Sequence, residues 1–434
     1  MKKGISLISL LLALIMVFTV AGCGSQPSSS QTENVGNSSA TSGDFDPYAG
    51  IENYNGKIIK MLVWWTLTDN EKQIIQNFTD KYGIEVKLIN TTLSDYQTKL
   101  ASMITSRNSP DLAALQAEFF PMAVVKNRFQ PIDLKIWNLE KDSDLDVAQM
   151  KQFVWNGNYY GASVKGSWFS EKAIVFYNKS MFENAGLDTP YEMFVNNEWN
   201  WDTLKEAAGK LTNSKKGIYG WGDRSYNRIN WLLANNTDLV NFNDGKITNN
   251  LTDKKVEDSL AYISDMISAG SVLVDSSLDD FTNGKVAMYV AGSSYMQTAA
   301  TLNTQMKSEW GVAPFPSPKD AEPMIANAGC VWGIPTNAKE PEAASYFIRY
   351  FLDPENETED RIANEECKKV YEYISDAENI RTGFSFGLIS FNSADDYYQI
   401  LRVAKEDRNN IPILLKSYQS LVDAAITSAM DEIG

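Results

Sequence analysis

The chain has 434 residues, of which 44% are hydrophobic, and it carries 39 Lys and Arg against 55 Asp and Glu. This length exceeds the usual size of one folded unit and predicts two domains. The net charge of −16 argues against nucleic acid or an anionic lipid surface as a partner. The sequence contains no histidine, which excludes Ser-His-Asp and Cys-His catalysis and zinc sites built on imidazole.

The first 22 residues have the pattern of a secretory signal. Lys2 and Lys3 precede the apolar run "ISLISLLLALIMVFTV", and "AGC" follows. The stretch before Cys23 resembles the bacterial lipobox, which implies that Cys23 is diacylated and becomes the mature N-terminus. The alternatives are an ordinary signal and an uncleaved anchor, since the run is nearly long enough to span a bilayer. Residues 23–50 are then the lipidated cysteine and a flexible tether rich in Ser, Gly, Asn and Thr.

From residue 57 onward, apolar strand patterns alternate with amphipathic helix patterns. The expected strands are 58–64, 83–89, 110–115, 172–178, 217–222, 285–292 and 330–335. The expected helices are 70–82, 95–106, 200–212, 227–236, 255–270 and 340–352, and the tail from 355 is mostly helical. This alternation predicts an α/β fold with parallel sheets covered by helices.

Two cysteines remain after Cys23. Cys330 and Cys367 could pair outside the cell, but one sequence does not show whether they meet. Two buried free thiols are the expected outcome, and a disulfide is the alternative.

Several stretches, in order, resemble one known family. They include "NFTDKYGIEV", "SPDL", "GNYYGASV", "IVFYNKSMFENAGLDTP", "FTNGKVAMYVAGSS", "WGVAPFPSP" and "GCVWGIP" before "EPEAASYFIRYFL". Together they resemble the carbohydrate-binding extracellular solute-binding proteins of bacterial ABC importers, the family that includes the maltose-binding protein. The resemblance covers the chain from about residue 56 to its end.

The resemblance implies a periplasmic-binding-protein-like fold of type II, with two discontinuous α/β lobes and a ligand cleft at the hinge. The chain would cross between lobes near 161–165, 312–316 and 352–355. The N-terminal lobe is then expected to hold residues 51–163 and 314–352, and the C-terminal lobe residues 164–313 and 353–434. Closure of the hinge around a ligand is the motion that this layout allows.

Candidate ligand contacts in the first half follow strand ends, because ligands bind beyond the carboxyl ends of strands in open α/β sheets. A saccharide site needs flat aromatic faces and side chains that hydrogen-bond hydroxyl groups. Neighbouring side chains on a strand point to opposite faces, so one of two adjacent indoles is expected in the core and the other, preferably Trp65, toward the ligand. The candidates are Trp64, Trp65, Gln116, Glu118 and, after the first crossover, Trp168. Asp111 is expected to be a structural cap.

Candidates in the second half lie at strand ends or near the C-terminus. Trp221 ends a strand, and Asp223 with Arg224 could clamp hydroxyl groups, although a solvated salt bridge is the alternative for Arg224. Ser293 and Ser294 open a helix whose free N–H groups suit hydroxyl oxygens. Tyr295 follows where the resembled family often has tryptophan, so this aromatic position departs from the family. The remaining candidates are Trp332 and Tyr418, whereas Trp155, Trp199, Trp201, Trp231 and Trp310 are expected in the core.

The expected function is capture of a sugar or oligosaccharide and its delivery to an ABC permease by a monomeric, non-enzymatic receptor without metal or cofactor. The lipid on Cys23 would hold it outside the cell membrane, and a Gram-positive source is expected. Two alternatives remain open at this point: the same fold binding a peptide, polyamine, polyol or glycerol-phosphate compound, and a secreted glycoside hydrolase that uses two carboxylates.

Overall fold

The computed structural model describes residues 45–167, 169, 171–243, 245–293, 302, 306, 309–327, 329–356, 364–390 and 394–433. All of these belong to one unit that begins at Phe45, and Cys23 lies outside the described residues. The folded part begins earlier than the predicted end of the tether at residue 50. Tyr48 already packs on the first lobe, with its ring 5.7 Å from that of Tyr82 and 6.2 Å from that of Tyr350.

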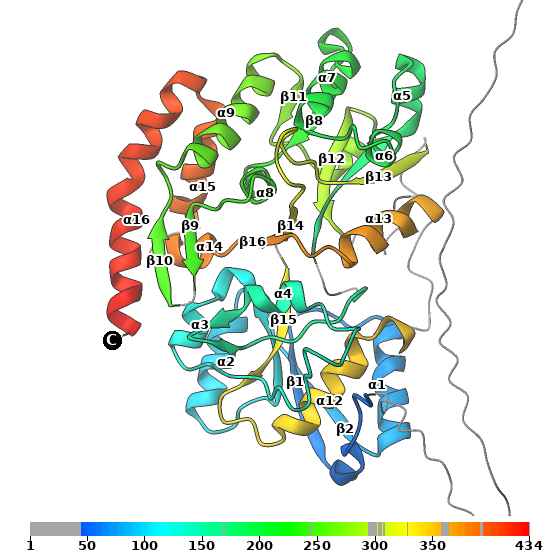
Figure 1. The fold of residues 1–434 in the computed structure, drawn as a ribbon, viewed down its shortest axis with the longest axis vertical. Coiled ribbons are helices and arrows are strands. Elements are labelled where there is room, and N and C mark those ends of the chain that lie inside the picture. Colours follow the sequence, from blue (N-terminus) through cyan, green and yellow to red (C-terminus); the bar gives the residue numbers. More distant parts are fainter. Residues whose placement is uncertain are drawn as a thin grey trace, which may run out of the picture. The chain divides into compact units, whose positions relative to one another are not determined.

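A five-stranded sheet forms the centre of the first lobe, in the lower half of Figure 1. In spatial order its strands are β2 (Glu85–Asn90), β1 (Ile58–Val63), β3 (Leu112–Gln116), β15 (Cys330–Pro335) and β4 (Phe129–Gln130). β1 is parallel to β2 and β3, whereas β15 is antiparallel to β3 and β4. β15 enters this sheet from more than 200 residues further along the chain, so the lobe is discontinuous and its sheet is mixed rather than parallel.

The first helix shows how local sequence sets these elements. α1 (Asp69–Tyr82) begins at Thr68, whose hydroxyl accepts from the Glu71 N–H while the Glu71 carboxylate accepts from the Thr68 N–H, forming a capping box. It ends at Gly83, which has a φ of 68° that glycine adopts without strain. The other helical segments of this lobe are η1 (Ile51–Tyr54), α2 (Tyr96–Thr105), η2 (Ala117–Phe119), α3 (Met122–Val125), α4 (Val147–Gln152) and α12 (Pro341–Leu352), and β5 (Val154–Trp155) pairs with β6 (Asn158–Tyr159).

A second five-stranded sheet forms the centre of the other lobe, in the upper half of Figure 1. Its strand order is β11 (Val272–Val274), β8 (Tyr219–Asp223), β12 (Val286–Gly292), β7 (Ala173–Asn178) and β13 (Trp310–Pro314). β8 is parallel to β11 and β12, and β7 is antiparallel to β12 and β13.

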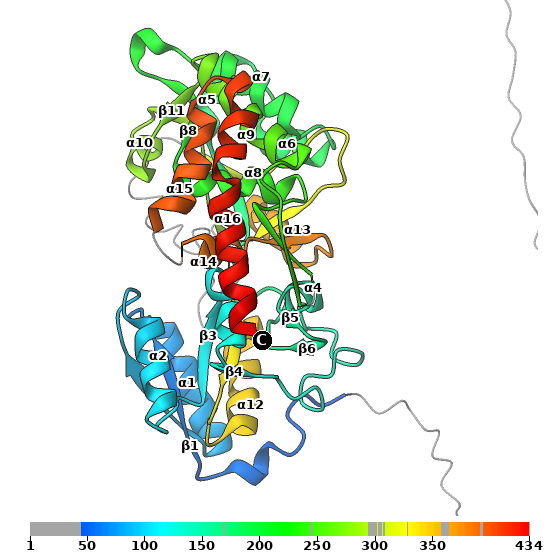
Figure 2. The same cartoon turned by 90° about the vertical axis from the view of Figure 1, so that its left-hand side faces the viewer.

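Helices surround this second sheet or pack on one another beside it. The helical segments of this lobe include α5 (Lys179–Ala185), α6 (Pro190–Val195), α7 (Trp201–Leu211), η3 (Ser214–Lys216), η4 (Ser225–Arg228), α8 (Ile229–Ala234), α9 (Lys254–Ser268), α10 (Leu278–Thr282), α13 (Glu365–Ser375), α14 (Ser385–Ile389), α15 (Ala394–Arg402) and α16 (Ile411–Ile433). The lobe also has a hairpin of β9 (Val240–Asn243) and β10 (Lys246–Asn249). α16 runs from this lobe toward the first one in Figure 2 and ends beside it, where Glu432 pairs with Lys126 at 3.0 Å. Within the described part of the chain, no helix combines the length and apolar character needed to cross a bilayer.

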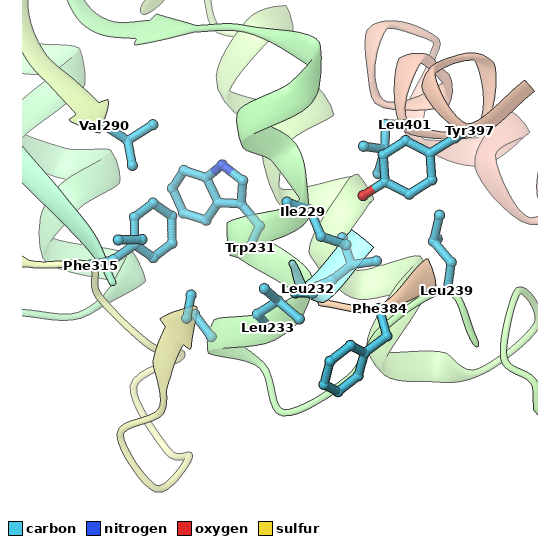
Figure 3. Packing of buried hydrophobic residues seen from close by; sticks show 14 of the residues in the cluster. Ile229, Trp231, Leu232, Leu233, Leu239, Val290, Phe315, Phe384, Tyr397 and Leu401 are labelled. Carbon is cyan, nitrogen blue, oxygen red and sulfur yellow. The ribbon is translucent and has the colours of Figure 1, made fainter. Parts of the chain in front are cut away.

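The core of the second lobe is built on aromatic packing. Figure 3 shows Trp231 between Phe315 and the leucines of α8. Its ring lies 4.8 Å from that of Phe315, 5.4 Å from that of Trp221 and 5.5 Å from that of Trp201. Trp155, Trp201, Trp231 and Trp310 are buried as predicted, while Trp199 is only partly buried and donates its indole N–H to the Pro314 carbonyl at 2.8 Å.

The crossings between lobes differ in place from the prediction. β13 lies in the second sheet, and the following segment to β14 (Ile325–Asn327) stays with that lobe, because the Trp201 N–H bonds the Ser317 carbonyl at 3.1 Å. The second crossing therefore falls near 327–330, not 312–316, and the boundary at 314 is wrong. The first crossing also comes later, since Phe169 still packs with the first lobe and β7 begins at Ala173.

A short parallel pair of strands and an aromatic cluster join the lobes. β14 pairs with β16 (Ile380–Thr382), which contacts α4 of the first lobe and α8 of the second. Next to it the rings of Phe120 and Phe153 lie 5.2 and 5.4 Å from that of Phe384.

Two further predictions can be compared with the structure. Cys330 and Cys367 are free thiols as predicted, but only Cys367 is buried, and Cys330 is partly exposed. Asp111 is a buried cap whose carboxylate accepts from the backbone N–H groups of Lys60, Lys339 and Glu340 at 2.7–3.0 Å.

Candidate ligand-binding site

Trp64 and Trp65 lie just past the end of β1, and both rings are partly exposed. The Trp65 indole N–H donates to Glu71 at 3.0 Å, and the other Glu71 oxygen caps α1. The Trp65 ring also lies 5.7 Å from Phe169 and 6.1 Å from Trp332. The start of α1 therefore fixes the orientation of Trp65.

Trp64 makes a different set of contacts. Its ring meets Trp65 edge to face at 5.0 Å and Tyr96 at 4.7 Å. Tyr96 is itself held by a hydrogen bond of 3.0 Å to the Ala114 carbonyl of β3. Both indoles are thus rigid, partly exposed aromatic surfaces at the carboxyl end of β1.

Gln116 and Glu118 follow the neighbouring strand. Gln116 pairs with Cys330 in the sheet, and its side-chain oxygen is buried without a hydrogen-bond partner among the described residues. Burial raises the pKa of Glu118 above the ordinary value for a glutamate. A polar oxygen and a partly desolvated carboxyl therefore lie at the end of β3.

Glu118 lies where the lobes meet. A Cβ atom at Gly387 of α14 would lie 1.4 Å from the Glu118 carbonyl oxygen, so only glycine permits this close approach. Tyr398 of the second lobe lies close enough for the charge of Glu118 to act on it. Burial raises the pKa of Tyr398, and the nearby charge of Glu118 and the Tyr226 phenol raise it further.

Arg224 belongs to the same group. Its guanidinium stacks over the Tyr226 ring at 4.6 Å. Burial raises the pKa of Tyr289, while a hydrogen bond with Arg224 opposes that shift. Arg224 and Tyr226 thus lie together in the second lobe near Tyr289, and Tyr226 also lies near Tyr398, the tyrosine on which the charge of Glu118 acts.

The segment that crosses between the lobes contributes a second acid. A Cβ atom at Gly292 would lie 1.7 Å from a carboxylate oxygen of Glu171, and one at Gly329 would lie 2.8 Å from the Glu171 N–H. Burial raises the pKa of the Cys330 thiol well above its ordinary value, and Glu171 and Glu118 add to the shift. Two carboxyl groups therefore lie close to Cys330.

The predicted Asp223–Arg224 clamp is wrong. Asp223 is buried and pairs with Arg228, whose side chain is 0% exposed, at 2.6 Å between Oδ2 and Nη2. Arg228 also donates to the Leu401 carbonyl at 3.0 Å. A buried carboxylate requires a partner, and the turn of η4 brings Arg228 rather than Arg224 onto it.

The remaining predicted residues are not part of the partly exposed set formed by Trp64, Trp65, Gln116, Glu118 and Arg224. Trp221 is 1% exposed and Trp332 is 0% exposed, so burial argues against either ring as a contact surface. Ser293 is buried and accepts from the Lys172 N–H at 3.1 Å. Tyr418 is half-buried on α16 against the second-lobe core. Trp168, Ser294 and Tyr295 lie outside the described residues.

Four residues near the junction of the lobes were not predicted from the sequence: Glu171, Tyr226, Tyr289 and Tyr398. Glu171 stands in "GSWFSEK", where only the tryptophan attracted notice. Tyr226 follows a strand end directly and could have been selected by the same rule as Arg224. Tyr398 lies in a helix at ordinary core spacing, and no sequence signal distinguishes it.

Together, the residues described at the junction of the lobes offer aromatic faces, phenol hydroxyls, carboxylates and one guanidinium. Such groups bind a polar ligand with apolar faces by stacking and hydrogen bonding. No set of three or more Asp, Glu, Cys or His suited to a metal ion occurs among the residues with described positions.

The chain is similar to known solute-binding proteins. The family described as bacterial extracellular solute-binding protein matches residues 73–361. The diacetylchitobiose binding protein DasA of Streptomyces coelicolor is 21% identical over 71% of this chain and 72% of its own length. The sn-glycerol-3-phosphate-binding periplasmic protein UgpB of Yersinia pestis is 22% identical over 67% of this chain and 70% of its own.

A solved structure supports the fold. The cyclic alpha-maltosyl-1,6-maltose binding protein of Arthrobacter globiformis superimposes with a TM-score of 0.65 at 18% identity, over 86% of this chain and 99% of that one. The two-lobed fold and the match over residues 73–361 establish that this chain belongs to the bacterial extracellular solute-binding proteins.

Proposed function

We propose that this chain is the substrate-binding component of an ABC importer and captures a sugar or oligosaccharide between its two lobes. The observation that carries the proposal is the set of aromatic, charged and hydroxyl groups that the two lobes offer near their junction. Trp64 and Trp65 offer partly exposed rings from the first lobe. In the second lobe Arg224 stacks on Tyr226, and Tyr398 lies within reach of the charge of Glu118. Stacking on sugar C–H faces and hydrogen bonding to hydroxyl groups need both kinds of group.

The family and the relatives support this proposal. Members bind solutes outside the cytoplasm, and DasA and the Arthrobacter protein carry sugar ligands in their names. Binding requires no bond cleavage, so the two nearby acids, Glu118 and Glu171, act as hydrogen-bond acceptors rather than as a hydrolytic pair.

A phosphate-bearing ligand is the second candidate, because UgpB is also a relative. Arg224 could pair with a phosphate group. Glu118 and Glu171 lie in the same region and repel an anion, which favours the neutral sugar.

A thermal-shift panel followed by calorimetry tests the proposal. It includes malto-, chito- and arabino-oligosaccharides, together with sn-glycerol 3-phosphate. At least one saccharide is expected to raise the melting temperature and to bind one per chain without being cleaved. Trp65→Ala is expected to weaken that binding. Stabilisation by the phosphate compound alone would assign the second candidate, and cleavage of the saccharide would make the protein an enzyme.

The location of the receptor at the membrane belongs to the same proposal. Acylation of Cys23 would supply two or more chains, enough for stable anchoring of a monomeric receptor to a Gram-positive cell membrane beside its permease. Cys23→Ala is expected to move the protein from the membrane fraction into the medium. Retention of the variant in the membrane fraction would favour an uncleaved anchor.

A further inference from the structure

A cavity of about 320 Å³ lies between the lobes and is lined by none of the candidate site residues. α4 of the first lobe supplies Lys151 and Gln152, and β9 and β16 supply Asn243 and Arg381; these three elements are labelled in Figure 1. This volume is in the range of cavities that hold one small organic molecule.

The two cations of the cavity lack carboxylate partners. Within the described part of the chain, Lys151 makes no hydrogen bond or ion pair, and Arg381 bonds only the Asn241 side-chain oxygen through Nη2. The Nε of Arg381 is buried, with no acceptor among the described residues. The buried arginines Arg228 and Arg349, in contrast, are paired with carboxylates.

Asp238 interacts electrostatically with Arg381, but its carboxylate oxygens already accept hydrogen bonds from other groups. It accepts from the backbone N–H groups of Leu239, Phe384 and Ser385 at 2.7–3.3 Å and from the Ser385 hydroxyl. No ion pair joins it to Arg381 in the described chain. The guanidinium therefore keeps donor capacity toward the cavity, although the chain as a whole has an excess of 16 negative charges.

The rest of the lining is apolar. Phe120, Phe242 and Phe384 line the cavity, and the Phe384 ring lies 5.2 Å from that of Phe120 and 5.9 Å from that of Phe242. A ligand that satisfies both parts has an oxyanion at one end and an apolar, flat body at the other.

We propose that this cavity is a binding site for a small organic oxyanion, a carboxylate or a phosphate monoester with an aromatic or aliphatic body. Arg381 holds the oxyanion through the guanidinium N–H groups other than the buried Nε, Lys151 adds a second positive charge, and the phenyl rings pack against the body. The site does not depend on the saccharide proposal, because it uses other residues and needs no sugar.

Calorimetric titration of the whole chain with benzoate and with phenyl phosphate tests the site, in the absence of saccharide. Benzyl alcohol serves as the neutral probe of similar shape, and inorganic phosphate as the anion without an apolar body. One or both aromatic anions are expected to bind, and benzyl alcohol and inorganic phosphate to bind at least about tenfold more weakly. Which aromatic anion binds better decides between a carboxylate and a phosphate.

Two substitutions locate the binding. Arg381→Gln is expected to weaken it about 10- to 100-fold, because a charged hydrogen-bond donor is lost. Lys151→Glu is expected to weaken it at least about tenfold, since Lys151 is exposed and its replacement puts a competing carboxylate beside Arg381. Lys216→Glu, which changes another exposed lysine in η3, is the matched control and is expected to leave binding unchanged.

Absence of binding at about 10 mM of either aromatic anion would overturn the proposal, because even a weak single-anion site saturates there. Binding that survives both substitutions would overturn it as well. If Arg381→Gln does not fold, the comparison of Lys151→Glu with Lys216→Glu decides, since both positions are on the surface.

Discussion

At the scale of single residues, the tryptophan pair shows that the alternation of side chains between two faces holds only within a strand. Alternation along a strand predicts that adjacent side chains point to opposite faces, and hence one buried indole and one free indole. β1 ends at Val63, so the alternation no longer governs Trp64 and Trp65, and their rings meet at 5.0 Å. Because Trp65 packs on Phe169 and Trp332, its removal is expected to lower stability as well as binding.

Glu118 makes saccharide binding depend on pH. Burial raises its pKa, and the ionised form is the stronger acceptor for sugar hydroxyls. As the pH falls, the carboxylate gains its proton above the pH of about 4.3 at which an ordinary glutamate does so. Calorimetry from pH 7 downward is therefore expected to show affinity falling about tenfold, beginning above that value.

Glu118→Gln supplies the control. Its affinity is expected to be lower at pH 7 and nearly constant with pH. A raised folded-state pKa means that ionised Glu118 costs stability at neutral pH, so the variant is expected to keep or raise the melting temperature. If the variant showed the same pH dependence of affinity as the unchanged protein, Glu118 would be excluded as the titrating group.

At the scale of elements, α14 and η2 form a contact that depends on one glycine. Gly387→Ala would place a methyl group 1.4 Å from the Glu118 carbonyl oxygen, so the backbone must shift. A loss of about 1–3 kcal/mol in the free energy of unfolding is expected, measured by urea denaturation. Gly209→Ala in α7 is the control, because nothing lies within 4 Å of the added carbon; it is expected to stabilise by up to about 1 kcal/mol. Equal effects of the two substitutions would show that the lobes are not in close contact at α14.

The segment that crosses between lobes is fixed by a buried lysine. Lys172 donates to Asp146 of the first lobe at 3.0 Å and to the Ile374 carbonyl of α13 at 2.8 Å. Lys172→Met leaves the buried Asp146 carboxylate without its cation and, among the described residues, with only the Gln149 N–H still bonded to it, so a loss of about 3–5 kcal/mol is expected on chemical denaturation. Lys210→Met, which breaks an exposed pair with Glu206, is expected to cost no more than about 0.5 kcal/mol. A small loss for Lys172→Met would mean that water reaches Asp146.

The elements that sequence predicted share strong local signals. The strands and helices predicted from apolar periodicity are present, including β1, α1, α7 and β15. Strand direction was not predictable, because β7 and β15 enter their sheets antiparallel after long crossings. β14 and β16 have three residues each and gain their stability from each other and from the lobes, so neither has a periodic signal.

The site was predictable only in part for the same physical reason. Strand ends identify Trp64, Trp65, Gln116, Glu118 and Arg224, because chain order fixes where a strand stops. The partner of Asp223 depends on the path of η4, and the approach of Tyr398 to Glu118 depends on how α14 and α15 pack against the first lobe. Contacts between segments hundreds of residues apart cannot be predicted from the local sequence pattern.

At the scale of the whole molecule, one ligand is expected to be held by both lobes. The first lobe offers the tryptophans and Glu118, and the second offers Arg224, Tyr226 and Tyr398. These groups come from segments on either side of the crossings at 165–173 and 327–330. A ligand that contacts both sides stabilises the closed arrangement by its differential affinity for that arrangement.

Hydrogen–deuterium exchange of the chain, with and without the saccharide that binds best, tests this claim most directly. Slower exchange is expected at residues 64–67 and 116–119 of the first lobe and, at the same saccharide concentration, at 224–228 and 397–402 of the second. Protection confined to one lobe, or found only around residues outside these segments, would contradict it.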